Sequence, residues 1–282
     1  MLTSLFLLSA LFSTAWSCPK HDNYQSHPHL GRRQVRVDKG REPKDWNYDV
    51  SADWATIKPD RADAQAEYHL CQSGTHQSPI NIAQQDLSIH HKPDFEGYKS
   101  VKIPGNFFNW QFAPAWTPHH PEGEVKGLPS FKFDGEEVFN IGWHIHAPSE
   151  HLIGGKRSRA EIHMVHVTAE EHEAAVIGIR LAVGQQESAF IKQLGPMIHY
   201  NDTAQLEGLE VNLRLAIDEV GGAEEFWTYK GSLTTPPCSE GLRWFLPKQE
   251  LVVSEQQMVE ILAASRFSHR VEQPVWLHDI NL

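Results

Sequence analysis

Short β-like segments separated by turn residues recur through the middle of this chain, and this pattern constrains its fold more than any other feature. Six such runs lie at residues 99–104, 106–112, 130–135, 136–146, 160–168 and 174–183. Glycine and proline punctuate them, and the Pro-rich stretch at 113–129 is interpreted as a surface loop. Regular short strands with such punctuation predict a mainly β (α+β) fold with a mostly antiparallel sheet.

Only two segments are typical of helices. Residues 254–265 begin with Ser254 as a potential N-cap, and Gln257 follows three residues later, as in a capping box. We expect one face of this helix to carry Met258, Ile261 and Leu262. Residues 187–194 are a second, shorter candidate.

Length and charge limit the classes of function. With 282 residues, 40% of them hydrophobic, the chain suits one large domain or two small ones. We find no internal repeat and no linker, which favours one. The formal net charge of −11 argues against a nucleic-acid partner, because no basic stripe offsets phosphate repulsion.

The first residues have the pattern of a secretory signal. An apolar run from Leu5 to Phe12 is followed by small residues that place cleavage before Cys18. A membrane anchor is the alternative, but the run is shorter than the ~20 residues needed to span a bilayer. We therefore expect residues 1–17 to be a signal peptide, 18–45 to be a flexible N-terminal segment or pro-segment, and 46–282 to be the folded domain of an exported protein without a membrane partner.

Three cysteines are present, and two of them are expected to pair in an oxidising compartment. Cys71 and Cys238 both lie within the predicted domain, beside turn-rich sequence, so we pair them. Cys18 is then removed with the signal, free, or available for an intermolecular bridge that would make a homodimer. Asn201 begins the only glycosylation sequon, which has meaning in a eukaryotic host.

The segment WHIHAPSEH, residues 143–151, places two histidines on one face of a predicted strand. Side chains two residues apart on a strand share a face, so His144 and His146 point the same way. The next predicted strand carries His163, with Glu161 on the same face. Three imidazoles with one open position match a catalytic zinc site, and Glu161 could hold the outer ring nitrogen of His163. An H-x-H pair alone is unspecific; the third histidine strengthens the prediction.

A second segment, GSLTTPPCSEGLRWF at 231–245, could supply a side chain that acts beside the predicted zinc site. Its two threonines precede two prolines, which stiffen the turn. Beside a zinc site, a threonine hydroxyl can accept a hydrogen bond from zinc-bound hydroxide and donate its own proton to a buried carboxylate. Other hydrolase and nucleotide motifs are missing: His172-Glu173 lacks the second histidine of H-E-x-x-H, and no G-x-S-x-G, Walker loop or G-x-G-x-x-G occurs.

Together, four motifs resemble the α-class carbonic anhydrases, and the form H-A-P-S-E-H is similar to the bacterial, plant and fungal branch. They are GTHQSPINI (74–82), WHIHAPSEH, AEIHMVH (160–166) and SLTTPPC (232–238). The resemblance spans roughly residues 46–282. It implies a central twisted sheet of about ten strands, a disulfide at Cys71 and Cys238, a Zn²⁺ cofactor and attack of zinc-bound hydroxide on CO2 to give bicarbonate and a proton.

The resemblance also implies roles for individual residues. The zinc ligands are His144, His146 and His163. Thr234 orients the hydroxide, and Glu150 is the buried carboxylate that accepts the threonine proton. The substrate side is lined by Thr235, Val165, Val176, Leu233, Leu242 and Trp244. Supporting positions are Glu161, Gln77, His151 and Tyr48.

Two residues depart from the family pattern. The position of the proton-shuttle histidine of fast members is Asn106, whose amide cannot titrate near neutrality. We therefore expect slow turnover that depends on buffer, unless His76, His119 or His120 substitutes. Gly142 replaces a glutamine that supports the first zinc ligand in many relatives. Two alternatives remain: a catalytically weak or non-enzymatic binding protein on the same fold, and a zinc hydrolase with esterase activity.

Overall fold

The computed structural model describes residues 35–37, 46–57, 68–83, 86–200, 202–265 and 267–282. The predicted signal peptide, Cys18 and the sequon residue Asn201 lie outside these ranges. Of the N-terminal segment 18–45, the structure describes only Val35–Val37, which form strand β1 against β11 (Ala204–Val211).

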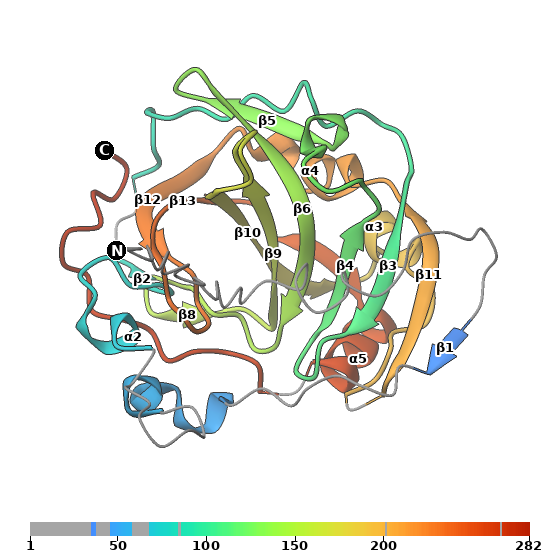
Figure 1. Ribbon diagram of the computed structural model, residues 1–282, viewed down its shortest axis with the longest axis horizontal. Helices are drawn as coiled ribbons and strands as arrows, with labels where there is room; N and C mark the ends of the chain where they lie inside the picture. Colours follow the sequence, from blue (N-terminus) through green and yellow to red (C-terminus); the bar gives the residue numbers. More distant parts are fainter. Residues whose placement is uncertain (1–34, 38–45, 58–67, 84–85, 201, 266) are drawn as a thin grey trace, which may run out of the picture.

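One large sheet organises the domain, and Figure 1 shows its strands fanning from β11 through β6 to β12. Along the sheet the order is β1, β11, β3 (Ile103–Asn109), β4 (Pro114–Pro118), β6 (Glu136–His146), β9 (Ala160–Val167), β10 (Glu173–Gly184), β13 (Glu240–Pro247) and β12 (Phe226–Ser232). Two more strands branch from it: β5 (Ser130–Phe133) pairs with β6, and β14 (Leu251–Ser254) pairs with β10. Within this large sheet, neighbouring strands are antiparallel except where β10 pairs with β13 and with β14. The predicted fold class is confirmed.

A small second sheet joins β2 (Asn81–Ile82), β7 (Leu152–Ile153) and β8 (Lys156–Arg157). Strands β7 and β8 form a hairpin in the connection between β6 and β9. This connection allows β6 and β9 to pair antiparallel, as the turn signals between them predicted.

The helices are short and peripheral. They are η1 (Tyr48–Thr56), α2 (Leu70–Ser73), η2 (Val125–Gly127), α3 (Ala189–Lys192), α4 (Arg214–Asp218), η3 (Gly221–Ala223) and α5 (Glu255–Ala264). Within the part of the chain that the structure describes, none is long and apolar enough to cross a bilayer. The capping box predicted at Ser254 and Gln257 is present at the start of α5.

Leu262 on α5 corrects the sequence analysis. Met258 and Ile261 are buried as expected, but the Leu262 side chain is 40% exposed. Successive residues on a helix are about 100° apart. The buried arc of α5 is centred near Ile261, so Leu262 falls beyond its margin.

The segment 113–129, interpreted as a surface loop, contains a second correction. Pro114–Pro118 form β4, a buried strand in the interior of the sheet between β3 and β6. Its two prolines lie at its ends, where fewer ladder hydrogen bonds are lost. The pairing of β4 with β6 covers only Ala115 and Trp116, which limits the cost further.

Alternation along the central strands separates the main core from the site. On β6, Trp143 and Ile145 pack into the largest apolar cluster, which also contains buried residues of α3, α4 and α5. The intervening His144 and His146 therefore face the other side of the sheet. An aromatic cluster that includes Trp46 and Tyr48 packs near this side, and it contains the disulfide between Cys71 and Cys238, whose Cα atoms are 5.1 Å apart.

Candidate metal centre

The register of β6 and β9 brings three histidines together. His144 lies directly opposite His163, and His146 is two residues along the same face of β6. The ring centroids are 4.4 Å apart for His146 and His163, 4.7 Å for His144 and His146, and 5.3 Å for His144 and His163. Each histidine offers one nitrogen, and these nitrogens all lie within 4.8 Å of one another. The arrangement is that of three convergent ligands for one ion.

Hydrogen bonds at the outer edges of the rings define which nitrogens face inward. Nδ1–H of His146 donates to the carbonyl of Ser268, and Nε2–H of His163 donates to Oε1 of Glu161 at 3.0 Å. These partners leave Nε2 of His146 and Nδ1 of His163 as acceptors. Among the described residues, the buried Nε2 of His146 has no hydrogen-bond partner.

The electrostatics of the three rings favour the neutral form. Burial is the largest cause that lowers the pKa of each, and the neighbouring histidine rings lower the pKa of His144 and His146 further. Metal coordination requires neutral imidazole. The convergent nitrogens, their neutral state and the unpartnered Nε2 of His146 therefore fit a bound divalent zinc ion.

The buried carboxylate of Glu161 accepts four hydrogen bonds around the site. Its Oε2 accepts hydrogen bonds from the backbone N–H groups of Glu150 and His151, at 3.0 and 2.9 Å. Its Oε1 accepts from His163 and, at 2.6 Å, from Nδ1 of His151. Burial alone would raise the pKa of Glu161, but the interactions with His151 and His163 outweigh burial and hold it well below its usual value. The carboxylate is thus ionised and fixed in orientation.

Glu150 lies beside two of the histidines and is hydrogen-bonded to the Thr234 side chain. Oε2 of Glu150 is 3.6 Å from Nε2 of His146 and 3.8 Å from Nδ1 of His163. Burial raises the pKa of Glu150 to about 8, while the Thr234 hydroxyl and the backbone N–H of Arg270 counteract part of that rise. Arg270 N–H donates to Oε1 at 2.7 Å, so the orientation of the carboxyl group is defined by the backbone.

The apolar wall comes from neighbouring strands. Val165 on β9 pairs with Val176 on β10, which pairs in turn with Trp244 on β13. Leu233 and Leu242 are buried in the same apolar cluster as Val176 and Trp244. The Trp244 ring is 4.8 Å from that of His163.

Three other predicted positions occupy the surroundings of the site. Thr235 is buried beside Thr234 in the turn between β12 and β13. Gln77 donates its amide hydrogens to the carbonyl of Cys238 at 3.0 Å and to Oε1 of Glu240 at 2.9 Å, which ties it to the same turn. The Tyr48 ring lies 6.2 Å from that of His146, and its buried hydroxyl has no hydrogen-bond partner among the described residues.

Both departures from the family pattern have visible consequences. The buried Nδ1 of His144 has no hydrogen-bond partner within the described part of the chain, as expected where Gly142 replaces a glutamine. Asn106 lies on the site face of β3 opposite Thr117, and its Oδ1 accepts a hydrogen bond from Nε2 of His119 at 2.6 Å. His119, one of the three histidines considered as substitutes, thus contacts Asn106.

Sequence reasoning missed two groups of supporting residues. Nε2 of His151 and the hydroxyl of Tyr229 are 2.6 Å apart, and that hydroxyl is 2.8 Å from Ser78 Oγ. Ser268 and Arg270 reach the site through backbone atoms, and the buried Arg270 guanidinium donates to two carbonyls, Cys71 O and Ser78 O. A backbone contact carries no side-chain signature, so no local pattern in the sequence could have indicated the second group.

The chain is similar in sequence to known proteins. A family model described as eukaryotic-type carbonic anhydrase matches residues 59–279. The putative carbonic anhydrase 3 of Caenorhabditis elegans is 33% identical over 199 residues, covering 66% of this chain and 78% of the relative. Alpha carbonic anhydrase 3 of Arabidopsis thaliana is 32% identical over 218 residues, covering 76% and 72%.

The fold is also shared with a solved structure. The alpha-carbonic anhydrase of Photobacterium profundum superposes with a TM-score of 0.64 at 23% identity, covering 82% of this chain and 95% of the other. At that identity the likeness concerns the fold. The family match over most of the chain and the two relatives above 30% identity show that the chain belongs to the eukaryotic-type carbonic anhydrase family of enzymes.

Proposed function

We propose that the chain catalyses the zinc-dependent, reversible hydration of carbon dioxide to bicarbonate and a proton. Family membership supports carbon dioxide hydration in general. The observation that carries the zinc dependence is the convergence of His144, His146 and His163 with their inward nitrogens within 4.8 Å of one another. The retained triad argues against the alternative of a non-enzymatic binding protein.

The chain's own residues would hold the ion and position its reactive ligand. When bound at the triad, Zn²⁺ would supply the nucleophile at neutral pH, because it lowers the pKa of a coordinated water to about 7. The Thr234 hydroxyl would accept a hydrogen bond from that group and donate its own to the carboxylate of Glu150. The positive charge of a bound ion would lower the pKa of this carboxyl, which burial raises to about 8, and so favour the ionised form that accepts from Thr234. Since Glu150 is held by the N–H of Arg270, the threonine has one favourable orientation.

Carbon dioxide binding would depend on the apolar wall. Carbon dioxide has no net charge and little hydrogen-bonding capacity, so a dry surface beside the reactive oxygen holds it without competing for that oxygen. Val165, Val176 and Trp244 lie in one lateral row of the sheet, next to the row that contains His144 and His163. We assign carbon dioxide to this wall, and weak ester hydrolysis would use the same oxygen.

The decisive test combines zinc content with hydration kinetics. The purified chain is expected to contain about one zinc per molecule and to lose activity when a chelator removes the metal. His163→Ala is expected to lose both zinc and activity, because it removes one of three ligands. His172→Ala is the matched control on the surface. Activity retained after complete zinc removal would contradict the proposal.

We further propose that the protein is exported, with residues 1–17 removed, Asn201 glycosylated in a eukaryotic host and Cys18 available for a bridge between two chains. The buried disulfide Cys71–Cys238 supports an oxidising compartment. Expression of the full sequence, followed by N-terminal sequencing and mass determination with and without reductant, tests these points. A cell-retained product that still begins at Met1 would contradict export.

A further inference from the structure

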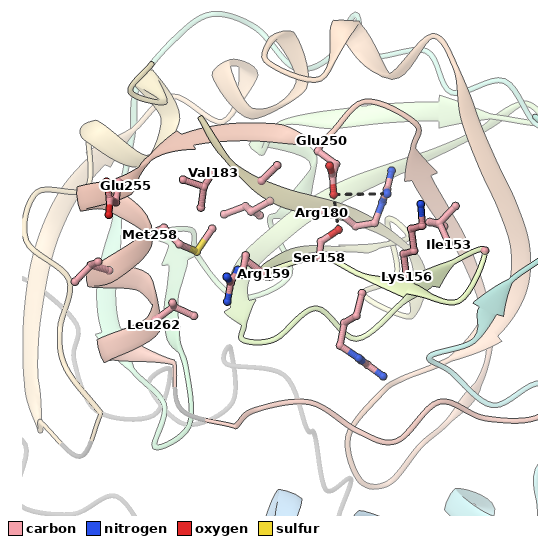
Figure 2. A pocket seen from close by; sticks show the side chains of 15 residues that line it. Ile153, Lys156, Ser158, Arg159, Arg180, Val183, Glu250, Glu255, Met258 and Leu262 are labelled. Atoms are coloured by element: carbon pink, nitrogen blue, oxygen red, sulfur yellow. Dashed lines mark hydrogen bonds and ion pairs between the residues drawn. The ribbon is translucent and has the colours of Figure 1, made fainter. Parts of the chain in front are cut away.

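A groove on the outside of the domain lies apart from the metal centre. It runs between the β7–β8 hairpin, the end of β10 and helix α5, and its hollow measures about 1000 Å³ (Figure 2). A second hollow of about 430 Å³ continues it past Leu262 to Phe267. We call the two together the α5 groove. Neither the three histidines nor Glu150 nor Thr234 lines it.

One side of the α5 groove is apolar and open to solvent. The exposed fractions of its side chains are 49% for Val183, 55% for Val259, 40% for Leu262 and 67% for Phe267. The buried face of α5 uses Met258 and Ile261 instead, so Val259 and Leu262 are not needed for the core. Contiguous exposed apolar side chains that border polar ones are typical of interaction sites.

The other side of the groove is basic, although the chain as a whole carries a net charge of −11. Arg180 is 3.8 Å from Glu250 and also donates to backbone carbonyls. Arg157 is paired at 2.9 Å with Glu272. These two cations are therefore largely neutralised within the domain.

Two cations in the groove remain available. Lys156 and Arg159 are exposed, and neither forms an ion pair with any residue that the structure describes. Figure 2 shows Arg159 between the hairpin and the Leu262 side of α5. The one other carboxylate of the lining, Glu255, lies in the first turn of α5 at the far end of the groove from Lys156.

We propose that the α5 groove binds an acidic, partly apolar peptide segment of a partner protein. The partner's carboxylates face Lys156 and Arg159, and its apolar side chains pack on Val259, Leu262 and Phe267. Charge complementarity selects an acidic occupant, and the two joined hollows favour an extended chain over a compact small molecule. The concave shape between a helix and a hairpin suits a peptide better than a flat lipid surface.

The test measures binding of a fluorescein-labelled peptide in which Glu alternates with Leu, by fluorescence anisotropy on the full zinc-loaded chain at low salt. The expected result is saturable binding that weakens with salt, with no binding of the Gln–Leu or Lys–Leu counterparts. The double variant Lys156→Glu with Arg159→Glu is expected to weaken binding about tenfold or more. Leu262→Ser is expected to weaken it through the apolar side.

A double variant with the same change in net charge, Lys99→Glu with Lys126→Glu, is the matched control and is expected to bind as the unmodified chain does. Circular dichroism and hydration activity check that all variants are folded. Peptide binding unchanged by the Lys156/Arg159 reversal overturns the proposal. So does capture by phosphatidylserine vesicles without peptide binding, or self-association of the chain that the reversal abolishes. The first outcome would mean that the peptide binds elsewhere, and the other two would assign the groove to a lipid surface or to a second copy of the chain.

Discussion

The side chain of His119 is hydrogen-bonded through Nε2 to Oδ1 of Asn106 at 2.6 Å, at the rim of the face that carries the metal centre. The two residues come from adjacent strands: Asn106 lies within β3, and His119 follows directly after β4. The amide at position 106 cannot carry a proton, but it holds an imidazole that can. Burial lowers the pKa of His119, while Glu207 raises it in part.

Replacing His119 with alanine is therefore expected to affect proton transfer and not carbon dioxide binding. In dilute buffer, turnover of His119→Ala should fall several-fold below that of the unmodified chain. In concentrated imidazole buffer the two rates should converge, because the buffer then removes the proton. The KM for carbon dioxide should stay unchanged. Stopped-flow hydration across a buffer series measures both quantities.

The control for this prediction is His120→Ala, which removes the neighbouring histidine. It is expected to leave the buffer dependence unchanged. The prediction would be contradicted if the unmodified chain and His119→Ala both turned over at a rate independent of buffer. His119 and its partner Asn106 would then take no part in proton export.

Glu150→Gln tests the role of the buried carboxyl. The backbone N–H of Arg270 would hold the amide oxygen at the position of Oε1, so the amide NH2 group would face Thr234 and could not accept its hydrogen bond. The Thr234 hydroxyl then loses its preferred orientation. We expect kcat to fall by about 100-fold or more while zinc content is retained, since Glu150 is no ligand of the ion. Glu240→Gln, at a half-buried carboxylate tied to Gln77, is the control. Full activity in Glu150→Gln would remove this residue from the mechanism.

Much of the metal centre followed from strand alternation. His144 and His146 share a face because they are two residues apart, and Trp143 and Ile145 occupy the core for the same reason. The capping box of α5 was equally local, since it needs only two side chains three residues apart. Short-range geometry of this kind can be predicted from sequence.

Long-range pairing could not be predicted in the same way. The prolines of β4 made this buried strand look like a loop. The pairing of β3 with β4, which places His119 beside Asn106, could therefore not be predicted. Ser268 reaches His146 through a carbonyl, and the sequence separation is 122 residues. Such contacts depend on how the C-terminal segment crosses the domain, which no local pattern records.

Restoring the glutamine of the family pattern at Gly142 is expected to destabilise this protein. From the family pattern alone, a glutamine introduced there would satisfy Nδ1 of His144. The backbone at Gly142 has φ of 145°, and an added Cβ would come within 2.6 Å of the Trp116 carbonyl. We therefore expect Gly142→Gln to lower the free energy of unfolding by roughly 1–3 kcal/mol. Urea denaturation measures this, and Gly127→Ala, where an added Cβ meets nothing within 4 Å, is the control. Unchanged stability with tighter zinc binding would contradict it.

The disulfide is expected to contribute strongly to stability. Cys71 and Cys238 are both buried and close a loop with a sequence separation of 167. In the chain-entropy model a loop of that length contributes about 5 kcal/mol. The double variant Cys71→Ala with Cys238→Ala should lose a comparable amount in urea unfolding. The unmodified chain should lose a similar amount in dithiothreitol, and the double variant should be insensitive to the reductant. A loss far below this value would mean that the unfolded chain is already compact.

His166 predicts how stability depends on pH. This residue is buried on β9, the Tyr98 hydroxyl lies 2.5 Å from its Nε2, and burial lowers its pKa from 6.5 to about 3. Between these two values the unfolded chain binds a proton that the folded chain does not bind. The free energy of unfolding therefore falls as the pH is lowered through this window, by about 1.4 kcal/mol per pH unit from this one group.

The variant His166→Gln isolates that contribution, because the amide can still accept from Tyr98 but does not titrate. Between about pH 7 and about pH 5, the unmodified chain should lose about 2 kcal/mol more than the variant in urea unfolding. The comparison cancels the protonation of the zinc ligands, which are the same in both proteins. His172→Gln, at an exposed histidine, controls for the loss of a histidine as such. Parallel stability curves for the unmodified chain and His166→Gln would show that the buried ring takes up its proton without unfolding.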